Sequence, residues 1–176
     1  MPTDGELSDI VIREYRDSDY PVCRELWAEL VRYHQVLYQT LFSGSDDPGR
    51  GFDKYLKNPI RRGTWVAELY GNVVGMGGLY VESEAHGEVE PMIVSEKYRG
   101  KGIGGALMKQ IVTEAEKTGT RFLSITPGAR NEKSLSAFAR MGFKNVWTVQ
   151  LIRELKRESG IKWRPGLKIY DNELGC

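Results

Sequence analysis

Apolar and polar residues alternate along this chain with two different periods, which predict a protein built from both strands and helices. Short apolar runs with the composition of strands succeed one another in the middle of the chain. A GlyAsn pair separates two of them, as is typical of a β-hairpin. The predicted strands are 10–15, 64–70, 73–81, 88–94, 121–126 and 147–155.

Other segments carry apolar residues at the helical spacing of three and four positions. Val22, Leu26 and Leu30 show this spacing, and AspSerAsp at 17–19 supplies N-cap residues just before them. The predicted helices are 20–38, a short one near 52–57, one over 103–115, and one that carries Leu135 and ends at Gly142. The polar segment 43–51 is rich in turn-forming residues and predicts a mobile loop.

Strands that first follow one another and then alternate with helices favour an α/β fold. We expect a mixed, mostly antiparallel, twisted sheet of roughly six to seven strands with helices on both faces. At 176 residues the chain has the length of one domain. We place a single domain at 1–156 and a C-terminal tail, assigned to no element, at 157–176.

Composition and charge exclude several classes of partner. The 25 basic and 24 acidic residues leave a formal net charge of +1, whereas a nucleic-acid-binding surface normally unbalances that count. No apolar run reaches the roughly 20 residues of a membrane helix, and the N-terminal residues are polar and acidic. We expect a cytoplasmic protein that binds neither nucleic acid nor membrane.

The cysteines and histidines provide no metal site. Cys23 lies within a predicted helix and Cys176 is the last residue, so they form no ligand spacing. The only histidines are His34 and His86. We therefore expect no metal.

Glycine is concentrated between the strand that ends at Val94 and the helix that follows it. Four of the six residues from 100 to 105 are glycine, and Arg99 and Lys101 flank the first of them. A bare backbone at a helix N-terminus suits a phosphate or pyrophosphate, because the first amides are unpaired and the helix dipole is positive there. The spacing predicts a nucleotide-bearing ligand.

Two kinds of nucleotide ligand and one structural explanation compete for these glycines. Gly100, Gly102 and Gly105 fit the GxGxxG pattern of dinucleotide sites, but the predicted strand 121–126 ends with no carboxylate to hold a ribose. Glycines that only shape a tight turn are the other alternative. They would cost the helix roughly 0.5–1 kcal/mol each relative to alanine.

Two stretches carry a family resemblance. ValSerGluLysTyrArgGlyLysGlyIleGly, from Val94, resembles the acetyl-CoA signature of the GCN5-related N-acetyltransferase (GNAT) superfamily, and Arg99, Gly102 and Gly104 match its pattern. The stretch 131–143, AsnGluLysSerLeuSerAlaPheAlaArgMetGlyPhe, resembles the second motif of that family, an Asn that opens a helix ending in GlyPhe. The order of elements agrees, so the resemblance implies the acyl-CoA N-acyltransferase fold.

The resemblance implies acetyl-CoA as acyl donor. Its pyrophosphate would bind the backbone amides of the glycine-rich turn, and its pantetheine arm would run beside the strand that ends at Val94. The implied cofactor-binding residues are Met92, Ile93, Val94, Arg99, Gly100, Lys101, Gly102, Ile103, Gly104, Gly105, Asn131 and Ser134. For Asn131, capping of its own helix is an equal alternative.

Attack of an amine on a thioester requires the neutral amine, and a carboxylate or water must take its proton. The candidates for this base are Glu90, Glu88 and His86. Glu88 and Glu90 alternate onto one face of the strand before the turn. Glu90 and His86 also stand nine and thirteen residues before Arg99, at spacings where some relatives carry a Glu or their base. Solvent-exposed strand residues are the alternative. Relatives often carry a tyrosine that protonates the leaving thiolate where this chain has Phe138, so Tyr80, Tyr98 or Ser134 must substitute, or the thiolate leaves unaided.

The acceptor side of the resemblance falls on the first helix and the loop after it. The implied substrate-binding residues are Trp27, Tyr33, His34 and Tyr38, although a half-buried helix-face position explains His34 equally well. Glu82, Glu84, Glu88 and Glu90 form a local acidic cluster that would attract a cationic amine.

We expect an N-acetyltransferase that moves an acetyl group from acetyl-CoA to a primary amine of a small molecule or a protein, by direct transfer in a ternary complex. An acyl-CoA-binding regulatory protein of the same fold, suggested by Phe138, and a dinucleotide-dependent oxidoreductase are the alternatives. The sequence leaves a homodimer open.

Overall fold

The computed structural model describes residues 9–38, 46–153, 164–169 and 171–174. These residues fall into two compact units. The first unit contains 9–31 and 46–126, and the second contains 32–38, 127–153, 164–169 and 171–174. The structure describes the predicted loop 43–51 only from residue 46 onward. It describes the predicted tail 157–176 only at 164–169 and 171–174.

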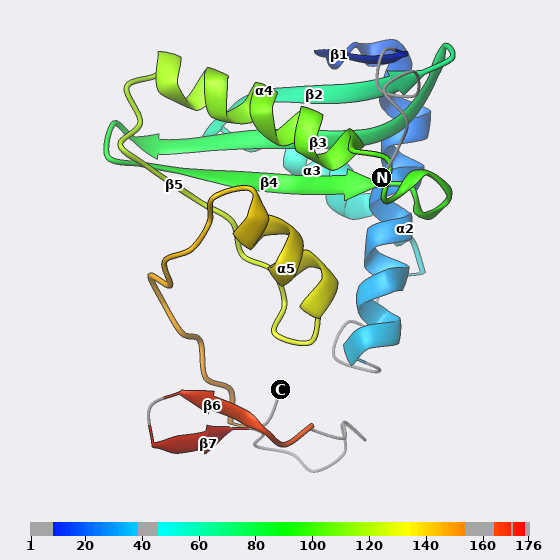
Figure 1. Cartoon of the computed structure of the whole chain (residues 1–176). Helices are drawn as coiled ribbons and strands as arrows, with labels where there is room; N and C mark the ends of the chain where they lie inside the picture. Colours follow the sequence, from blue (N-terminus) through cyan, green and yellow to red (C-terminus); the bar gives the residue numbers. More distant parts are fainter. Residues whose placement is uncertain (1–8, 39–45, 154–163, 170, 175–176) are drawn as a thin grey trace. The chain divides into compact units, whose positions relative to one another are not determined.

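The first unit is built on a five-stranded mixed sheet with the strand order β1-β2-β3-β4-β5 (Figure 1). Strands β1 to β4 pair with one another in antiparallel fashion, and β5 runs parallel to β4. The strands are β1 Ile10–Glu14, β2 Arg61–Leu69, β3 Asn72–Ser83, β4 His86–Val94 and β5 Phe122–Ser124. The predicted mixed and mostly antiparallel sheet is confirmed.

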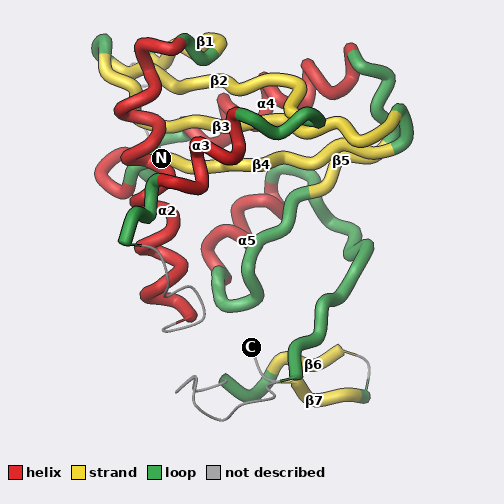
Figure 2. Tube along the Cα trace, turned by 180° about the vertical axis from the view of Figure 1, so that it is seen from behind, coloured by secondary structure: helices red, strands yellow, loops and turns green. Residues whose placement is uncertain are grey.

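Helices lie on both faces of this sheet (Figures 1 and 2). Helix α4 covers one face, and α3 with the first part of α2 covers the other. The helices are α2 Tyr20–Tyr38, α3 Arg50–Leu56 and α4 Ile103–Lys117, with short 3-10 turns η1 Asp17–Asp19 and η2 Glu96–Tyr98. They agree with the predicted helices to within two residues at each end, since the apolar stripe of each is explicit in the sequence.

Two alternate glycines of the central strand β3 allow a helix to pack closely against one face of the sheet. Gly77 faces α4, where an added Cβ would lie 2.7 Å from Ile111 Cδ1. Gly75 faces the same helix, and a Cβ there would lie 3.4 Å from Leu107 Cδ1. The approach at Gly77 is closer than van der Waals contact allows, so Ile111 of α4 lies closer to the sheet than a side chain larger than glycine at position 77 would permit.

The opposite face holds the main hydrophobic core. Phe52 and Tyr55 of α3 stack with ring centroids 5.8 Å apart, and Tyr55 also packs against Tyr80 of β3. The buried members of this core are Cys23, Leu26, Phe52, Tyr55, Val66, Met76, Tyr80 and Ile93. Burial raises the pKa of the Cys23 thiol to about 12, so this cysteine is a packing residue rather than a nucleophile.

The second unit contains α5, Glu132–Arg140, and a separate hairpin of β6, Leu167–Ile169, with β7, Asn172–Leu174. Within it, the backbone N–H of Arg130 donates to the Tyr38 hydroxyl at 2.8 Å. The Arg130 guanidinium lies 5.3 Å from the centre of the Tyr38 ring. The division of the chain at residue 156 stays a prediction.

The predicted strand 147–155 is wrong over the residues that the structure describes. Residues 147–153 form no strand, and Trp147 and Leu151 are exposed by 86% and 71%. An alternating apolar pattern becomes a strand only where a partner edge pairs with it, and no described strand does so. The sheet consequently has five described strands instead of the expected six or seven, and β5 is shorter than the predicted 121–126.

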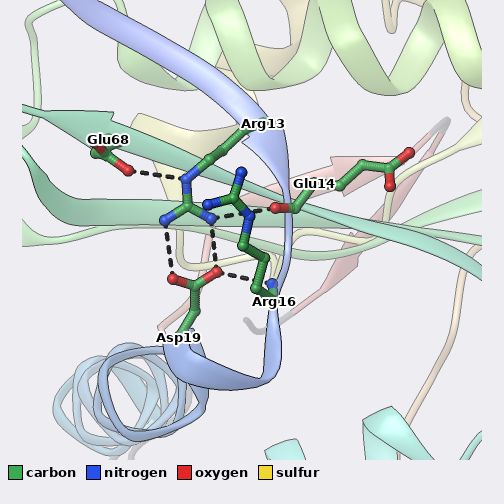
Figure 3. A network of polar contacts seen from close by, with 5 residues as sticks. All are labelled: Arg13, Glu14, Arg16, Asp19 and Glu68. Atoms are coloured by element: carbon green, nitrogen blue, oxygen red, sulfur yellow. Dashed lines mark hydrogen bonds and ion pairs between the residues drawn. The ribbon is translucent and has the colours of Figure 1, made fainter.

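A polar network joins β1 to the entry of α2 (Figure 3). The Arg13 guanidinium donates to both carboxylate oxygens of Asp19, at 2.7 and 2.9 Å, and to Glu68 on β2 at 2.8 Å. Asp19 is buried and also accepts the backbone N–H of Arg16. The hydrogen bonds from Arg13 lower the pKa of Asp19 below its ordinary value, and the Arg16 N–H adds to that effect.

We expect Asp19→Asn to lower the free energy of unfolding at pH 7 by about 2 kcal/mol, because it leaves the partly buried Arg13 guanidinium without its main partner. The contribution of Asp19 is complete above its unfolded pKa of about 3.9 and is lost as pH falls through the lower folded pKa. Urea denaturation at pH 7 and pH 3 should therefore show the variant and wild type converging at the lower pH. Glu68→Gln, at a more exposed partner, is the smaller control, and an equal loss from both variants would contradict this account.

Candidate active site

The segment after β4 presents a helix N-terminus without a side-chain cap. Gly100 and Gly102 have φ angles of +80° and +81°, in the left-handed region that favours glycine. Gly102 is the N-cap of α4, and no side chain accepts a hydrogen bond there. The first amides of α4 lack intrahelical partners, as in every helix, and the positive end of the helix dipole lies beside them. The sequence prediction of an anion-binding helix start at Ile103 is consistent with this geometry.

The backbone of the turn is not covered by other described parts of the protein at Gly100 and Gly105. Beyond the chain neighbours and the backbone of α4 itself, a Cβ atom added at either position would meet no described atom within 4 Å. At Gly100 the positive φ explains the glycine, but Gly105 lies inside α4 and has no such backbone requirement. Alanine at position 105 would favour the helix, so no packing contact of the described protein accounts for glycine there. The bare backbone suits close approach by a ligand.

Strand β4 has a free edge that leads into this turn. Strand β5 pairs only with the residues His86 to Glu88, so the later residues of β4 have no described partner on that side (Figure 2). The N–H of Ser95 donates to Val74 O, and the register opposes Ile93 to Met76. By the alternation of an antiparallel ladder, the backbone groups of Met92 and Val94 therefore point to the free edge, while those of Ile93 pair with β3.

Arg99 is bonded to the protein through its guanidinium. Its Nε donates to Val94 O at 2.8 Å, and its Nη2 donates to Glu29 Oε1 at 3.2 Å. The sequence interpretation treated Arg99 and Lys101 as added positive charge at the turn. In the structure, Arg99 also fixes the path of the backbone between β4 and α4.

Glu88 and Glu90 lie on the face of β4 that carries the aromatic core. Glu88 pairs in register with Tyr80 and accepts a hydrogen bond from the Thr126 hydroxyl at 3.0 Å. Glu90 is exposed as a whole residue, yet desolvation by the protein around its carboxyl group raises its pKa, and the charge of Glu88 raises it further. Burial and the charge of Glu90 raise the pKa of Tyr80. These three titratable groups therefore interact electrostatically.

His86 occupies the start of the same strand, beside β5. Its Nε2 lies 2.9 Å from Ser124 Oγ, and its Nδ1 lies 3.6 Å from Glu82 Oε2. The structure thus places His86, Glu88 and Glu90 on alternate residues of β4, and for Glu88 and Glu90 the sequence predicted this alternation. Their roles in catalysis stay predictions.

The four predicted acceptor residues of α2 divide between the two units. Trp27 packs on the core, 5.7 Å from the Tyr55 ring. In the second unit, the Tyr33 hydroxyl donates to Asn131 Oδ1 at 3.2 Å, and Tyr38 is buried. His34 is half-buried, and this burial lowers its pKa, as the alternative of a helix-face position expects.

The second motif forms the N-terminus of α5 in the second unit. Asn131 is buried, and its side-chain oxygen accepts the backbone N–H of Ser134 at 3.2 Å, so the predicted helix cap is confirmed. Contact of Asn131 or Ser134 with a cofactor stays a prediction. Phe138 packs edge-on against Phe143, with ring centroids 6.4 Å apart.

Sequence reasoning missed three residues of this region. Thr126 and Ser124 bond to Glu88 and His86 because β5 pairs in parallel with β4, a pairing that no local pattern specifies. Glu29 is seventy residues from its partner Arg99, and its only sequence signal was its place on the polar side of an amphipathic helix.

Among the described residues, no group of three or more His, Cys, Asp or Glu side chains is placed to hold a metal ion. In the part of the chain that the structure describes, no helix is long and apolar enough to cross a membrane.

Solved structures share this fold. Aminoglycoside N-acetyltransferase AAC(6')-Iy in complex with CoA has a TM-score of 0.61 at 16% identity, covering 84% of this chain and 95% of its own. The aminoglycoside acetyltransferase meta-AAC0020 from an uncultured soil metagenomic sample, in complex with sisomicin, has a TM-score of 0.61 at 17% identity, covering 85% and 98%. The ribosomal-protein-S18-alanine N-acetyltransferase from Escherichia coli has a TM-score of 0.58 at 17% identity, covering 76% of each chain. At these identities the likeness concerns the fold alone, and the predicted fold class is confirmed.

Sequence comparison identifies the family. An uncharacterized N-acetyltransferase of Methanocaldococcus jannaschii is 27% identical over 129 residues, which cover 61% of this chain and 57% of that protein. The chain thus spans little more than half the length of this curated relative. The family model described as "Acetyltransferase (GNAT) family" matches residues 22–143, more than half of the chain. The chain therefore belongs to the acetyltransferase (GNAT) family, which confirms the resemblance of its glycine-rich turn.

Proposed function

We propose that this protein is an N-acetyltransferase that moves an acetyl group from acetyl-CoA to a primary amine by direct transfer in a ternary complex. The observation that carries the proposal is the edge of β4 without a described partner, which leads through the 3-10 turn η2 to the glycine turn at the start of α4. An extended arm that ends in a pyrophosphate has the shape and charge to occupy both. Membership of the acetyltransferase family supports the same donor.

The residues present fit acetyl-CoA. The backbone amides of the turn from Arg99 to Gly104, with Gly105 leaving space, would hold the pyrophosphate. The free N–H groups of Met92 and Val94 would pair with the pantetheine arm. One of these amides would stabilise negative charge on the thioester oxygen, an effect worth roughly 3–4 kcal/mol in other enzymes. When bound, acetyl-CoA supplies the electrophilic carbonyl.

Glu90 is the residue best suited to take the proton of the acceptor amine. A lysine-like amine with a pKa of about 10.4 is almost entirely protonated at pH 7, so removing its proton is part of the barrier. The raised pKa of Glu90 brings it closer to that of the amine than an ordinary carboxylate. Glu88 would hold Glu90 in this state by its charge, and His86 would bind or orient the acceptor.

The leaving thiolate needs a different donor from the one that many relatives use, because Phe138 has no hydroxyl. Among the substitutes from the sequence, Tyr80 interacts with Glu90, and its raised pKa keeps its phenol protonated at neutral pH. We therefore assign the acid to Tyr80 rather than to Tyr98 or Ser134. Unaided departure of the thiolate is the alternative.

The acceptor is a cationic amine. Glu82, Glu84, Glu88 and Glu90 give the rim of the site a local negative charge, which favours such substrates. The similar structures named above include enzymes named for aminoglycosides and for a ribosomal-protein alanine, so both a small polyamine and a protein N-terminus fit this charge. A non-catalytic acyl-CoA-binding protein is the second candidate, and Phe138 is the observation that favours it.

We expect acetyl-CoA and free CoA to raise the melting temperature, and NADH not to. At a hundred times its dissociation constant a ligand adds about 2.7 kcal/mol to the free energy of unfolding.

We expect Gly105→Ala to leave the ligand-free melting temperature unchanged or higher, because alanine favours the helix. The same variant should weaken acetyl-CoA binding about tenfold. Glu116→Ala, an exposed position at the far end of α4, is the control. Wild-type affinity of Gly105→Ala for acetyl-CoA would contradict a pyrophosphate site at this turn. A higher melting temperature with NADH would favour a dinucleotide ligand.

We expect Glu90→Gln to lower kcat/KM at pH 7 by about 10²- to 10⁴-fold across a panel of primary amines, while acetyl-CoA binding persists. A base must be ionised, so wild-type activity should fall as pH drops below the raised pKa of Glu90, and the variant should lack this acidic limb. Glu116→Gln, at an exposed position on the far end of α4 and outside the acidic cluster, is the matched control. Wild type that binds acetyl-CoA but acetylates no amine would support the non-catalytic alternative.

A further inference from the structure

The connection between β4 and α4, residues 95–102, is held from outside by one side chain of α2. Glu29 Oε1 accepts the backbone N–H of Glu96 at 2.6 Å and the Nη2 of Arg99 at 3.2 Å. Arg99 in turn donates from Nε to Val94 O at 2.8 Å. A single carboxylate therefore bonds both ends of the 3-10 turn η2, and through Arg99 it is linked to the last residue of β4. We call residues 95–102 the cofactor turn.

These bonds act on a segment whose own structure is sparse. Besides those of helices, the backbone hydrogen bonds between described residues of the turn are Tyr98 N–H to Ser95 O and Arg99 N–H to Glu96 O. The two glycines at 100 and 102 cost the segment conformational entropy when it is fixed. A charge-assisted bond from a packed helix supplies order that the local sequence does not.

The charge of Glu29 would act in the opposite direction on an anionic ligand. The Glu29 side chain is 29% exposed, and its carboxylate is hydrogen-bonded to the turn that we propose holds a pyrophosphate. Coulomb repulsion alone predicts that removal of this carboxylate tightens binding of the anion. Ordering of the turn predicts that removal weakens it. The two effects differ in sign, so one measurement separates them.

We propose that Glu29 is a positioning residue for acetyl-CoA, which orders the cofactor turn and directs the Arg99 guanidinium to the protein backbone instead of to the ligand. This inference rests on the proposed function. Because Glu29 follows Trp27 by two residues on α2, the same helix borders the predicted acceptor side and holds the cofactor turn.

The test compares Glu29→Ala and Glu29→Gln with Glu25→Gln, which removes the same charge one turn earlier on α2. Calorimetric titration with acetyl-CoA, steady-state kinetics with a fixed amine, and amide hydrogen exchange of residues 95–102 without ligand are measured for each. We expect Glu29→Ala to raise the Kd and the KM for acetyl-CoA about tenfold while kcat stays within about twofold, and to accelerate exchange in the turn. Glu29→Gln keeps an oxygen acceptor for the Glu96 N–H and should recover most of the affinity. The control should match wild type.

Tighter acetyl-CoA binding in Glu29→Ala would overturn the proposal in favour of simple repulsion. Unchanged affinity together with unchanged exchange would overturn it as well. If wild type binds no acetyl-CoA, the proposed function fails, and exchange in the ligand-free protein still decides whether Glu29 orders the turn. Equal loss of affinity in the Glu25→Gln control would show a general charge effect and contradict a specific role for Glu29.

Discussion

Close packing against the central strand β3 is the constraint on which the first unit depends. On one side, Gly75 and Gly77 leave space for Leu107 and Ile111 of α4. On the other side, Gly78 leaves space for the Tyr55 hydroxyl and the Glu90 carbonyl, which an added Cβ would overlap. A strand usually gains stability from branched side chains, so three glycines in its interior weaken it locally. That loss is offset because both helices approach the sheet closely enough to bury their apolar faces.

This packing also positions the N-terminus of α4 relative to the end of β4. Helix α4 can start directly after the cofactor turn because Leu107 and Ile111 hold it against β3. Its N-terminal amides then lie beyond the end of β4, whose free edge leads to the same place. A buried Tyr55, hydrogen-bonded to Thr64 at 2.6 Å, supports the face that carries Glu88 and Glu90. Burial raises the pKa of the Tyr55 phenol, so this residue is a neutral support rather than a proton donor.

Electrostatic groups in the first unit fall into two functional kinds. The partly buried Arg13 neutralises the buried Asp19, and this pair contributes to stability. Desolvation and the charge of Glu88 raise the pKa of Glu90, which costs stability and suits the base that we propose. Glu29 and Arg99 lie between these kinds: their pairing joins α2 to the cofactor turn, and its effect on the ligand is the one proposed above.

The sequence by itself determined most of the elements and the family of this protein. Apolar periodicity specified α2 and α4, and the glycines from 100 to 105 with Arg99 carried the family resemblance and predicted an anion-binding helix start, because both signals are local. Tertiary structure alone decided that β5 stops after residue 124 and leaves the β4 edge free, that Thr126 meets Glu88, and that Glu29 meets Arg99. The same limit explains the failed strand at 147–153: alternation gives a segment the potential to pair, but a partner edge in three dimensions decides whether it does.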